Sequence, residues 1–125
     1  MPPELETVLV VDDDAAVRAA LKFALEVEGF GVRVYDSAAA LLADDSLPLW
    51  ACLVIDYRMP DIDGLELVDR LRARQVALPA ILISGRVNTQ LRYHAQRLGV
   101  TRVLEKPLSD AALVESIRLA FAPAG

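Results

Sequence analysis

The chain has 125 residues, of which 54% are hydrophobic and 25% are charged, and its formal net charge is −5 at pH 7. A chain of this length fits one domain, and the composition is typical of globular rather than disordered proteins. The acidic balance disfavours direct nucleic-acid binding, and no apolar run reaches the ~18–20 residues that cross a bilayer.

The sequence carries no signal for export. Its first residues lack the basic region and the long apolar segment of a secretory signal. The single cysteine, Cys52, cannot form an internal disulfide. We therefore expect a cytoplasmic protein with no membrane segment.

Five short segments have the apolar patterns of β-strands. Residues 8–11, 53–55 and 80–83 are continuous apolar runs, which are typical of strands that are buried on both faces. Residues 31–35 alternate polar and apolar side chains, and residues 102–105 are polar at both ends. We expect these last two segments to form the edges of a sheet.

A helix is predicted after each strand. Apolar residues recur at helical spacing in all five connecting segments, although the pattern between residues 86 and 99 is the least regular. Residues that favour helix N-termini precede three of these segments, namely Asp14, Ser37 and Ser109. A turn at residues 60–64 leads into the third helix, and Gly29 and Gly99 follow the first and fourth.

This alternation predicts an α/β fold. Three buried strands between two edge strands fit a doubly wound, five-stranded parallel sheet of flavodoxin-like order 2-1-3-4-5, with helices on both faces. We expect the domain to cover residues 7–121, after an N-terminal extension of residues 1–6. The small-residue stretch 122–125 is expected to be a tail or the start of a linker.

Polar side chains follow four of the predicted strands. Asp12 and Asp13 follow the first strand, Asp56 the third, Ser84 the fourth and Lys106 the fifth. Because the carboxyl ends of parallel strands open on one crevice, we expect these five residues to form a single site.

The three carboxylates in this set point to a bound cation. Carboxylates that converge repel one another, and a divalent cation relieves that repulsion. A few oxygen ligands suit Mg²⁺, which is typically held by one or two carboxylates together with phosphate oxygens. One cysteine and one histidine, His94, cannot make a zinc site. Taken alone, residues 12–14 would equally fit a capped helix start with solvated charges.

The same residues could support phosphoryl transfer to a carboxylate. Asp56 would be the nucleophile that forms an aspartyl phosphate. Mg²⁺ and Lys106 would neutralise the equatorial phosphoryl oxygens, and Ser84 would offer a hydrogen bond.

Four ordered motifs resemble the signature of the receiver domains of two-component response regulators. They are Val10-Val11-Asp12-Asp13, Ile55-Asp56-x-x-Met59-Pro60-x-x-x-Gly64, Ile83-Ser84-Gly85 and Glu105-Lys106-Pro107, and the similarity spans residues 7–121.

The resemblance implies a role for each site residue. Asp56 would be the phosphoacceptor, Asp13 a direct Mg²⁺ ligand and Asp12 a ligand that often acts through water, with the backbone carbonyl of Arg58 completing the protein's share. Lys106 would pair with the phosphoryl oxygens, and Ser84 stands where the family has Thr or Ser. The Lys106–Pro107 bond would be cis.

The resemblance also implies partners. The phosphoryl group would come from a sensor histidine kinase or a phosphotransfer protein. If the chain is part of a longer regulator, a C-terminal output domain, most often DNA-binding, would follow it. The face made by the fourth helix, fifth strand and fifth helix would switch on phosphorylation and could form a homodimer.

One position departs from the family pattern and keeps an alternative open. Family members usually carry Tyr or Phe three residues before the lysine, and this chain has Val103. The alternative is a receiver-like module that signals without phosphorylation. A phosphatase of the haloacid-dehalogenase type, suggested by the spacing of Asp12 and Asp14, is disfavoured because Ala16 replaces its Thr or Val and no cap region fits.

Overall fold

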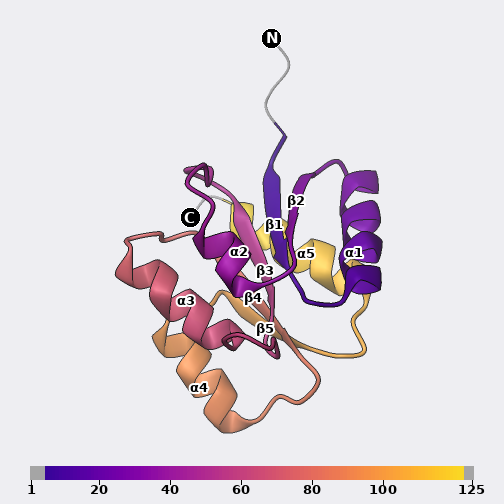
Figure 1. The fold of residues 1–125 in the computed structure, drawn as a ribbon. Coiled ribbons are helices and arrows are strands. Elements are labelled where there is room, and N and C mark those ends of the chain that lie inside the picture. The colour runs from indigo at the N-terminus through magenta and orange to yellow at the C-terminus, as the bar shows by residue number, and fades with distance from the viewer. Residues whose placement is uncertain (1–4, 123–125) are drawn as a thin grey trace.

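The computed structural model describes residues 5–122, which form a five-stranded parallel sheet with helices on both faces (Figure 1). The strand order is β2-β1-β3-β4-β5, as predicted from the sequence. Every neighbouring pair is parallel. The strands are β1 (Thr7–Val11), β2 (Gly31–Tyr35), β3 (Cys52–Asp56), β4 (Ala80–Ser84) and β5 (Arg102–Glu105).

A helix follows each strand, including the segment with the least regular pattern. The helices are α1 (Ala15–Val27), α2 (Ala38–Leu42), α3 (Gly64–Ala73), α4 (Thr89–Arg97) and α5 (Asp110–Phe121). The side chains of the three predicted cap residues accept hydrogen bonds from backbone N–H groups in the first turn. Asp63 and Asn88 cap α3 and α4 in the same way.

The core lies in two layers, one on each side of the sheet. Alternate residues of the central strands face opposite sides, which explains why their apolar runs are continuous. Val8, Val10 and Val54 pack with α1 and α5. Leu9 and Ile55 pack with α2, α3 and α4 on the other face.

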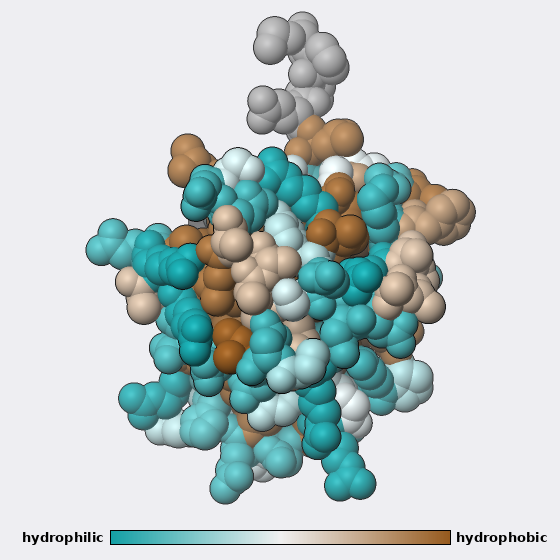
Figure 2. All heavy atoms as spheres, in the orientation of Figure 1, coloured by the Kyte–Doolittle hydropathy of each residue, from teal (hydrophilic) through white to brown (hydrophobic). Residues whose placement is uncertain are grey.

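The edge strands and the molecular surface are more polar than the core. β2 is partly or fully exposed along its whole length, whereas β3 and β4 are completely buried. Hydrophilic side chains cover most of the face shown in Figure 2, and hydrophobic ones gather over its upper half. Among residues 5–122, none of the helices has both the length and the apolar character that a bilayer crossing requires.

A single arginine ties the end of α3 to the end of α4. The Arg72 guanidinium donates hydrogen bonds to the carbonyl oxygens of Val76 (2.8 Å), Leu78 (2.9 Å), Leu98 (3.1 Å) and Gly99 (3.5 Å). Its burial lowers the pKa of Arg72, although the hydrogen bonds keep the charge satisfied. These four carbonyl groups lie outside the helices and strands, where backbone acceptors lack regular partners.

Replacing Arg72 with methionine should therefore destabilise the fold. Methionine keeps much of the apolar stem, but it leaves these carbonyl groups without donors, and we expect a loss of about 2–4 kcal/mol in the free energy of unfolding. Urea denaturation measures this loss of stability. Arg70→Met is the matched control on the same helix, because among residues 5–122 the Arg70 side chain makes one exposed ion pair, with Glu66. Equal losses in the two variants would contradict the role assigned to Arg72.

Candidate functional site

The register of the sheet brings the ends of its strands level. Val11 pairs with Ile55, Asp56 pairs with Ile83, and Ser84 pairs with Glu105. The residues at or just after these pairs therefore lie together at the carboxyl ends of the strands. The backbone N–H of Lys106 donates to the carbonyl of Ser84 (2.9 Å), which holds the lysine at these strand ends as well.

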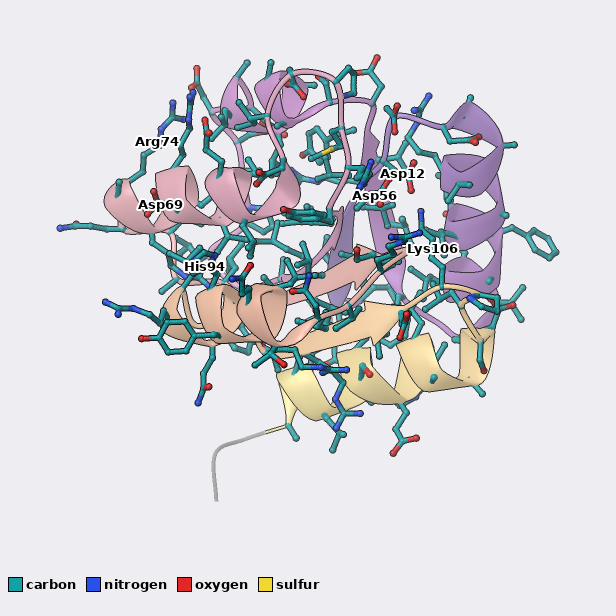
Figure 3. The ribbon with its side chains drawn as sticks, turned by 90° about the horizontal axis from the view of Figure 1, so that it is seen from below. Asp12, Asp56, Asp69, Arg74, His94 and Lys106 are labelled. Atoms are coloured by element: carbon teal, nitrogen blue, oxygen red, sulfur yellow. The ribbon has the colours of Figure 1, made fainter. Side chains whose placement is uncertain are left out.

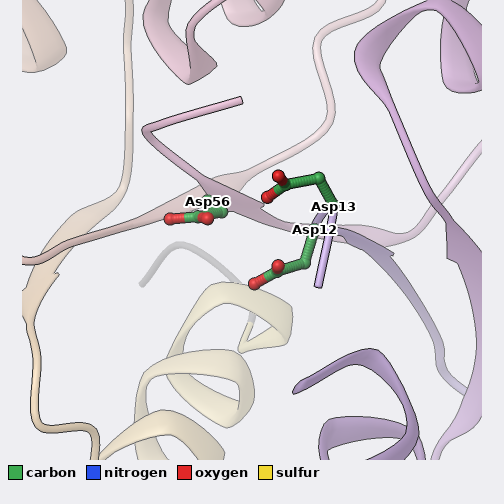
Figure 4. Close-up of side chains that lie close together, drawn as sticks. All are labelled: Asp12, Asp13 and Asp56. Carbon is green, nitrogen blue, oxygen red and sulfur yellow. The ribbon is translucent and has the colours of Figure 1, made fainter. Parts of the chain in front are cut away.

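Three carboxylates converge where β1 and β3 end. Asp12, Asp13 and Asp56 each offer an oxygen atom, and these atoms all lie within 4.8 Å of one another. Figure 4 shows the three side chains pointing into one space. Asp12 and Asp56 are 4% and 8% exposed, whereas Asp13 is open to solvent. This geometry confirms that the three residues lie together, as the sequence predicts.

Burial disfavours the ionised forms of the carboxylates in this cluster when no metal ion is bound. Desolvation raises the pKa of Asp12, and a backbone N–H from Asp14 (2.9 Å) offsets it only in part. Desolvation also raises the pKa of Asp56 against the lowering effect of Lys106. A divalent cation would remove this cost, and oxygen-only ligands of this kind fit Mg²⁺.

The predicted lysine reaches the central carboxylate. Lys106 Nζ lies 3.3 Å from Asp56 Oδ1, and the ammonium group is partly exposed. Figure 3 shows Asp12, Asp56 and Lys106 close together, whereas Asp69 and His94 lie away from them on α3 and α4. The Lys106–Pro107 bond is cis, as the resemblance implies.

Ser84 lies at the end of the neighbouring strand but is engaged elsewhere. It is 3% exposed, and its Oγ donates to the carbonyl oxygen of Arg86 (2.7 Å). The same Oγ accepts a hydrogen bond from the backbone N–H of Arg86 (3.3 Å). Within residues 5–122 no hydrogen bond joins Ser84 to Asp56. The hydroxyl group is therefore near the site and held by its own loop.

Two supporting residues were not predicted from the sequence. Arg18 donates to the backbone carbonyl of Asp12 (2.7 Å) from the first turns of α1. This six-residue separation is not a regular helical spacing, so no sequence pattern indicates it. Gly64 packs directly against the backbone of Asp56, although the sequence suggested only a turn. Its place at a fixed distance after Asp56 is the signal that could have suggested a close contact.

Comparison with known proteins identifies this arrangement. Residues 8–118 match the family model described as the response regulator receiver domain. The chain belongs to that family. The receiver is 44% identical over 117 residues to the transcriptional regulatory protein FixJ of Azorhizobium caulinodans, covering 93% of this chain and 55% of the relative. It is 41% identical over 116 residues to FixJ of Bradyrhizobium diazoefficiens, covering 91% of this chain and 56% of the relative.

Solved structures agree with this placement. The receiver superposes on full-length FixJ from B. japonicum with a TM-score of 0.82 and 40% identity, over 92% of this chain and 57% of that one. This chain thus spans about half the length of these two curated relatives. The receiver is a signalling domain of two-component response regulators, and no comparison favours a receiver that signals without phosphorylation.

Asp12→Asn should stabilise the metal-free receiver and weaken its binding of Mg²⁺. When the pKa of a carboxyl group is higher in the folded state than in the unfolded state, the protein loses stability as the pH rises through that folded-state pKa. At neutral pH the ionised form of Asp12 therefore opposes folding. Asparagine removes the charge and keeps an oxygen for the Asp14 N–H. We expect a melting temperature that is a few degrees higher in EDTA, and a smaller increase on adding Mg²⁺.

Thermal unfolding at pH 7, with and without Mg²⁺, measures both effects. Asp45→Asn, in the exposed loop after α2, is the control and should change neither. A lower melting temperature for Asp12→Asn in EDTA would show that charge repulsion does not limit the stability of this cluster.

Proposed function

We propose that this receiver accepts a phosphoryl group on Asp56. The supporting observation is that Asp56 ends a fully buried strand with Lys106 at 3.3 Å and with carboxylate oxygens of Asp12 and Asp13 within 4.8 Å. A carboxylate oxygen of Asp56 forms the bond to phosphorus while the bond from phosphorus to the donor's leaving group breaks.

The surrounding residues have separate tasks in this proposal. Asp12, Asp13, Asp56 and the backbone carbonyl of Arg58 hold Mg²⁺, which when bound neutralises charge on the phosphoryl oxygens. Lys106 pairs with the same oxygens from the side of β5. The Ser84 hydroxyl leaves the Arg86 carbonyl and donates to the phosphoryl group, which changes the loop before α4.

The proposal also covers the setting of the domain. The receiver extends over residues 7–121, with 122–125 as a tail or the start of a linker. It receives its phosphoryl group in the cytoplasm from a sensor histidine kinase or a phosphotransfer protein. The reactions that it catalyses are its own phosphorylation and the hydrolysis of the resulting aspartyl phosphate. The similar FixJ proteins are transcriptional regulators, so we propose that its output is a DNA-binding domain and that the face of α4, β5 and α5 carries the signal, in part by forming a homodimer.

Incubation with acetyl phosphate and Mg²⁺, followed by gel electrophoresis that retards phosphorylated proteins, tests this function. A retarded band that needs Mg²⁺ and fades slowly supports a phosphorylated switch. Continuous release of inorganic phosphate without a retarded band would indicate a phosphatase. No retarded band and no released phosphate would indicate a module that signals without phosphorylation.

Val103 is the position where we expect the switch to be weak. It is half-buried on β5, pairs with Leu82 and packs against the core layer of α3 and α4. A valine fills about the same volume in both states, so it adds little to the energy difference that shifts their populations. Tyr93, an aromatic residue on the neighbouring helix α4, is 55% exposed and lies under Arg97 rather than in the core.

Val103→Tyr should therefore enlarge the response to phosphorylation. The measurement is the change in amide chemical shifts when beryllofluoride, a mimic of the phosphoryl group, is added to the wild type and to the variant. We expect larger changes through residues 86–105 in the variant. Large changes in the wild type that the tyrosine does not increase would show that an aromatic ring is dispensable here.

A further inference from the structure

Arg58 and Arg86 line two cavities near the carboxyl ends of the central strands, and one of these cavities contains Asp56 in its wall. The first cavity, of about 480 Å³, is lined by Asp56, Gly85 and Lys106 together with Arg58 and Arg86. The second, of about 470 Å³, lies toward α3 and α4, and Ser84 is in its wall. The residues that line the second cavity are Tyr57, Arg58, Leu65, Ser84, Arg86, Asn88, Gln90, Leu91 and His94. Arg58 and Arg86 thus stand between the acceptor carboxylate and the start of α4.

In the described part of the chain, neither guanidinium group has a hydrogen-bonding or ion-pair partner. Within residues 5–122, the side chains of Arg58 and Arg86 form no ion pair and donate no hydrogen bond, and both residues are exposed. Lys106, by contrast, already pairs with Asp56. Two uncommitted cations at the mouth of an acidic site are available for an added anion.

Phosphorylation would supply that anion. A divalent cation and Lys106 together balance the charge of Asp12, Asp13 and Asp56. A phosphoryl group bonded to an Asp56 oxygen replaces the single charge of the carboxylate with a larger negative charge, and the excess is left unbalanced. Arginine binds phosphoryl oxygens through two parallel N–H groups, and both arginines line the cavity that contains Asp56.

Arg86 differs from Arg58 in its backbone contacts. Ser84 Oγ donates to the Arg86 carbonyl (2.7 Å) and accepts from the Arg86 N–H (3.3 Å). Two residues later, Asn88 caps α4 by accepting a hydrogen bond from the Leu91 N–H (2.8 Å). A displacement of Arg86 therefore acts on both the serine and the first turn of α4.

We propose that Arg58 and Arg86 bind the phosphoryl oxygens on Asp56, and that of these two arginines only Arg86 transmits the binding to the start of α4. This inference rests on the proposed phosphorylation of Asp56. Arg86 thereby provides in this chain a connection between the acceptor site and α4 that does not need an aromatic ring at position 103. Arg58 adds affinity without that connection, because no hydrogen bond joins its backbone to Ser84 in residues 5–122.

Titration with beryllofluoride in the presence of Mg²⁺, followed by NMR, tests both parts. Arg86→Gln should weaken beryllofluoride binding roughly three- to tenfold and, at saturation, reduce the shift changes of residues 86–98 by about half. Arg58→Gln should weaken binding by a similar factor and leave the saturated shift changes intact. Arg86→Lys keeps one charge and should recover part of the affinity.

Arg92→Gln is the matched control, because Arg92 lies on the exposed side of α4 and lines neither cavity. Arg86→Gln and Arg92→Gln variants with the same affinity and the same shift changes would overturn this inference while wild-type binding upholds the proposed function. A wild type that binds no beryllofluoride would overturn both. Equal loss of the α4 response in Arg58→Gln and Arg86→Gln would overturn the assignment of transmission to Arg86.

Discussion

Asp56→Asn should abolish phosphorylation and leave the fold intact. The amide has nearly the shape of the carboxylate, but it is not a nucleophile toward phosphorus. Burial raises the pKa of Asp56, so at neutral pH its charge opposes folding, and its removal should not lower the stability of the metal-free chain. Mass spectrometry after acetyl phosphate treatment should show a gain of about 80 Da, one phosphoryl group, in the wild type and none in the variant.

Asp69→Asn is the control for this experiment. Asp69 is an exposed carboxylate on α3, and it lies apart from the cluster of Asp12, Asp56 and Lys106 (Figure 3). Its variant should be labelled as fully as the wild type. Labelling of Asp56→Asn at the wild-type level would place the phosphoacceptor on another residue, and the mapped phosphopeptide would identify it.

The strand order and the composition of the acidic cluster could be predicted from the sequence because both depend on strand ends. A continuous apolar run indicates a strand with two covered faces, and the polar residue directly after the run marks the carboxyl end of that strand. Asp12 and Asp56 follow such runs, and Lys106 follows the edge strand β5. Parallel pairing of the strands is therefore enough to bring the three residues together. The alternating pattern of β2 placed it at an edge for the same reason.

Contacts that depend on loop conformation could not be predicted in this way. The hydrogen bonds of Ser84 with Arg86 need a particular turn after β4, and serine at a strand end fits several turns equally well. Arg72 reaches carbonyl groups up to 27 residues away, and its place on α3 gives no sign of them. Long polar side chains are usually solvated, so a pattern based on apolar periodicity assigns them to the surface.

Gly64 shows how tightly the acceptor strand is held. Its N–H donates to the Tyr57 carbonyl at 2.7 Å, just after the end of β3. A Cβ atom at this position would lie 2.7 Å from a terminal methyl carbon of Leu82, 2.9 Å from the backbone oxygen of Asp56 and 3.0 Å from Ile55 Cγ2. The methyl group can move, but the backbone oxygen belongs to the acceptor residue itself. The start of α3 can therefore approach β3 this closely only because residue 64 has no side chain.

Gly64→Ala should destabilise the receiver and slow its phosphorylation together. Overpacking against a buried backbone costs about 1–3 kcal/mol, and relief of the contact must displace either α3 or the end of β3 that carries Asp56. Urea unfolding measures the first effect, and the rate of labelling by acetyl phosphate measures the second. Gly85→Ala is the control for stability, because a Cβ atom there meets nothing within 4 Å. Its free energy of unfolding should fall by less than about 0.5 kcal/mol. A Gly64→Ala chain that is as stable as Gly85→Ala and is labelled at the wild-type rate would show that β3 and α3 can separate without disturbing Asp56.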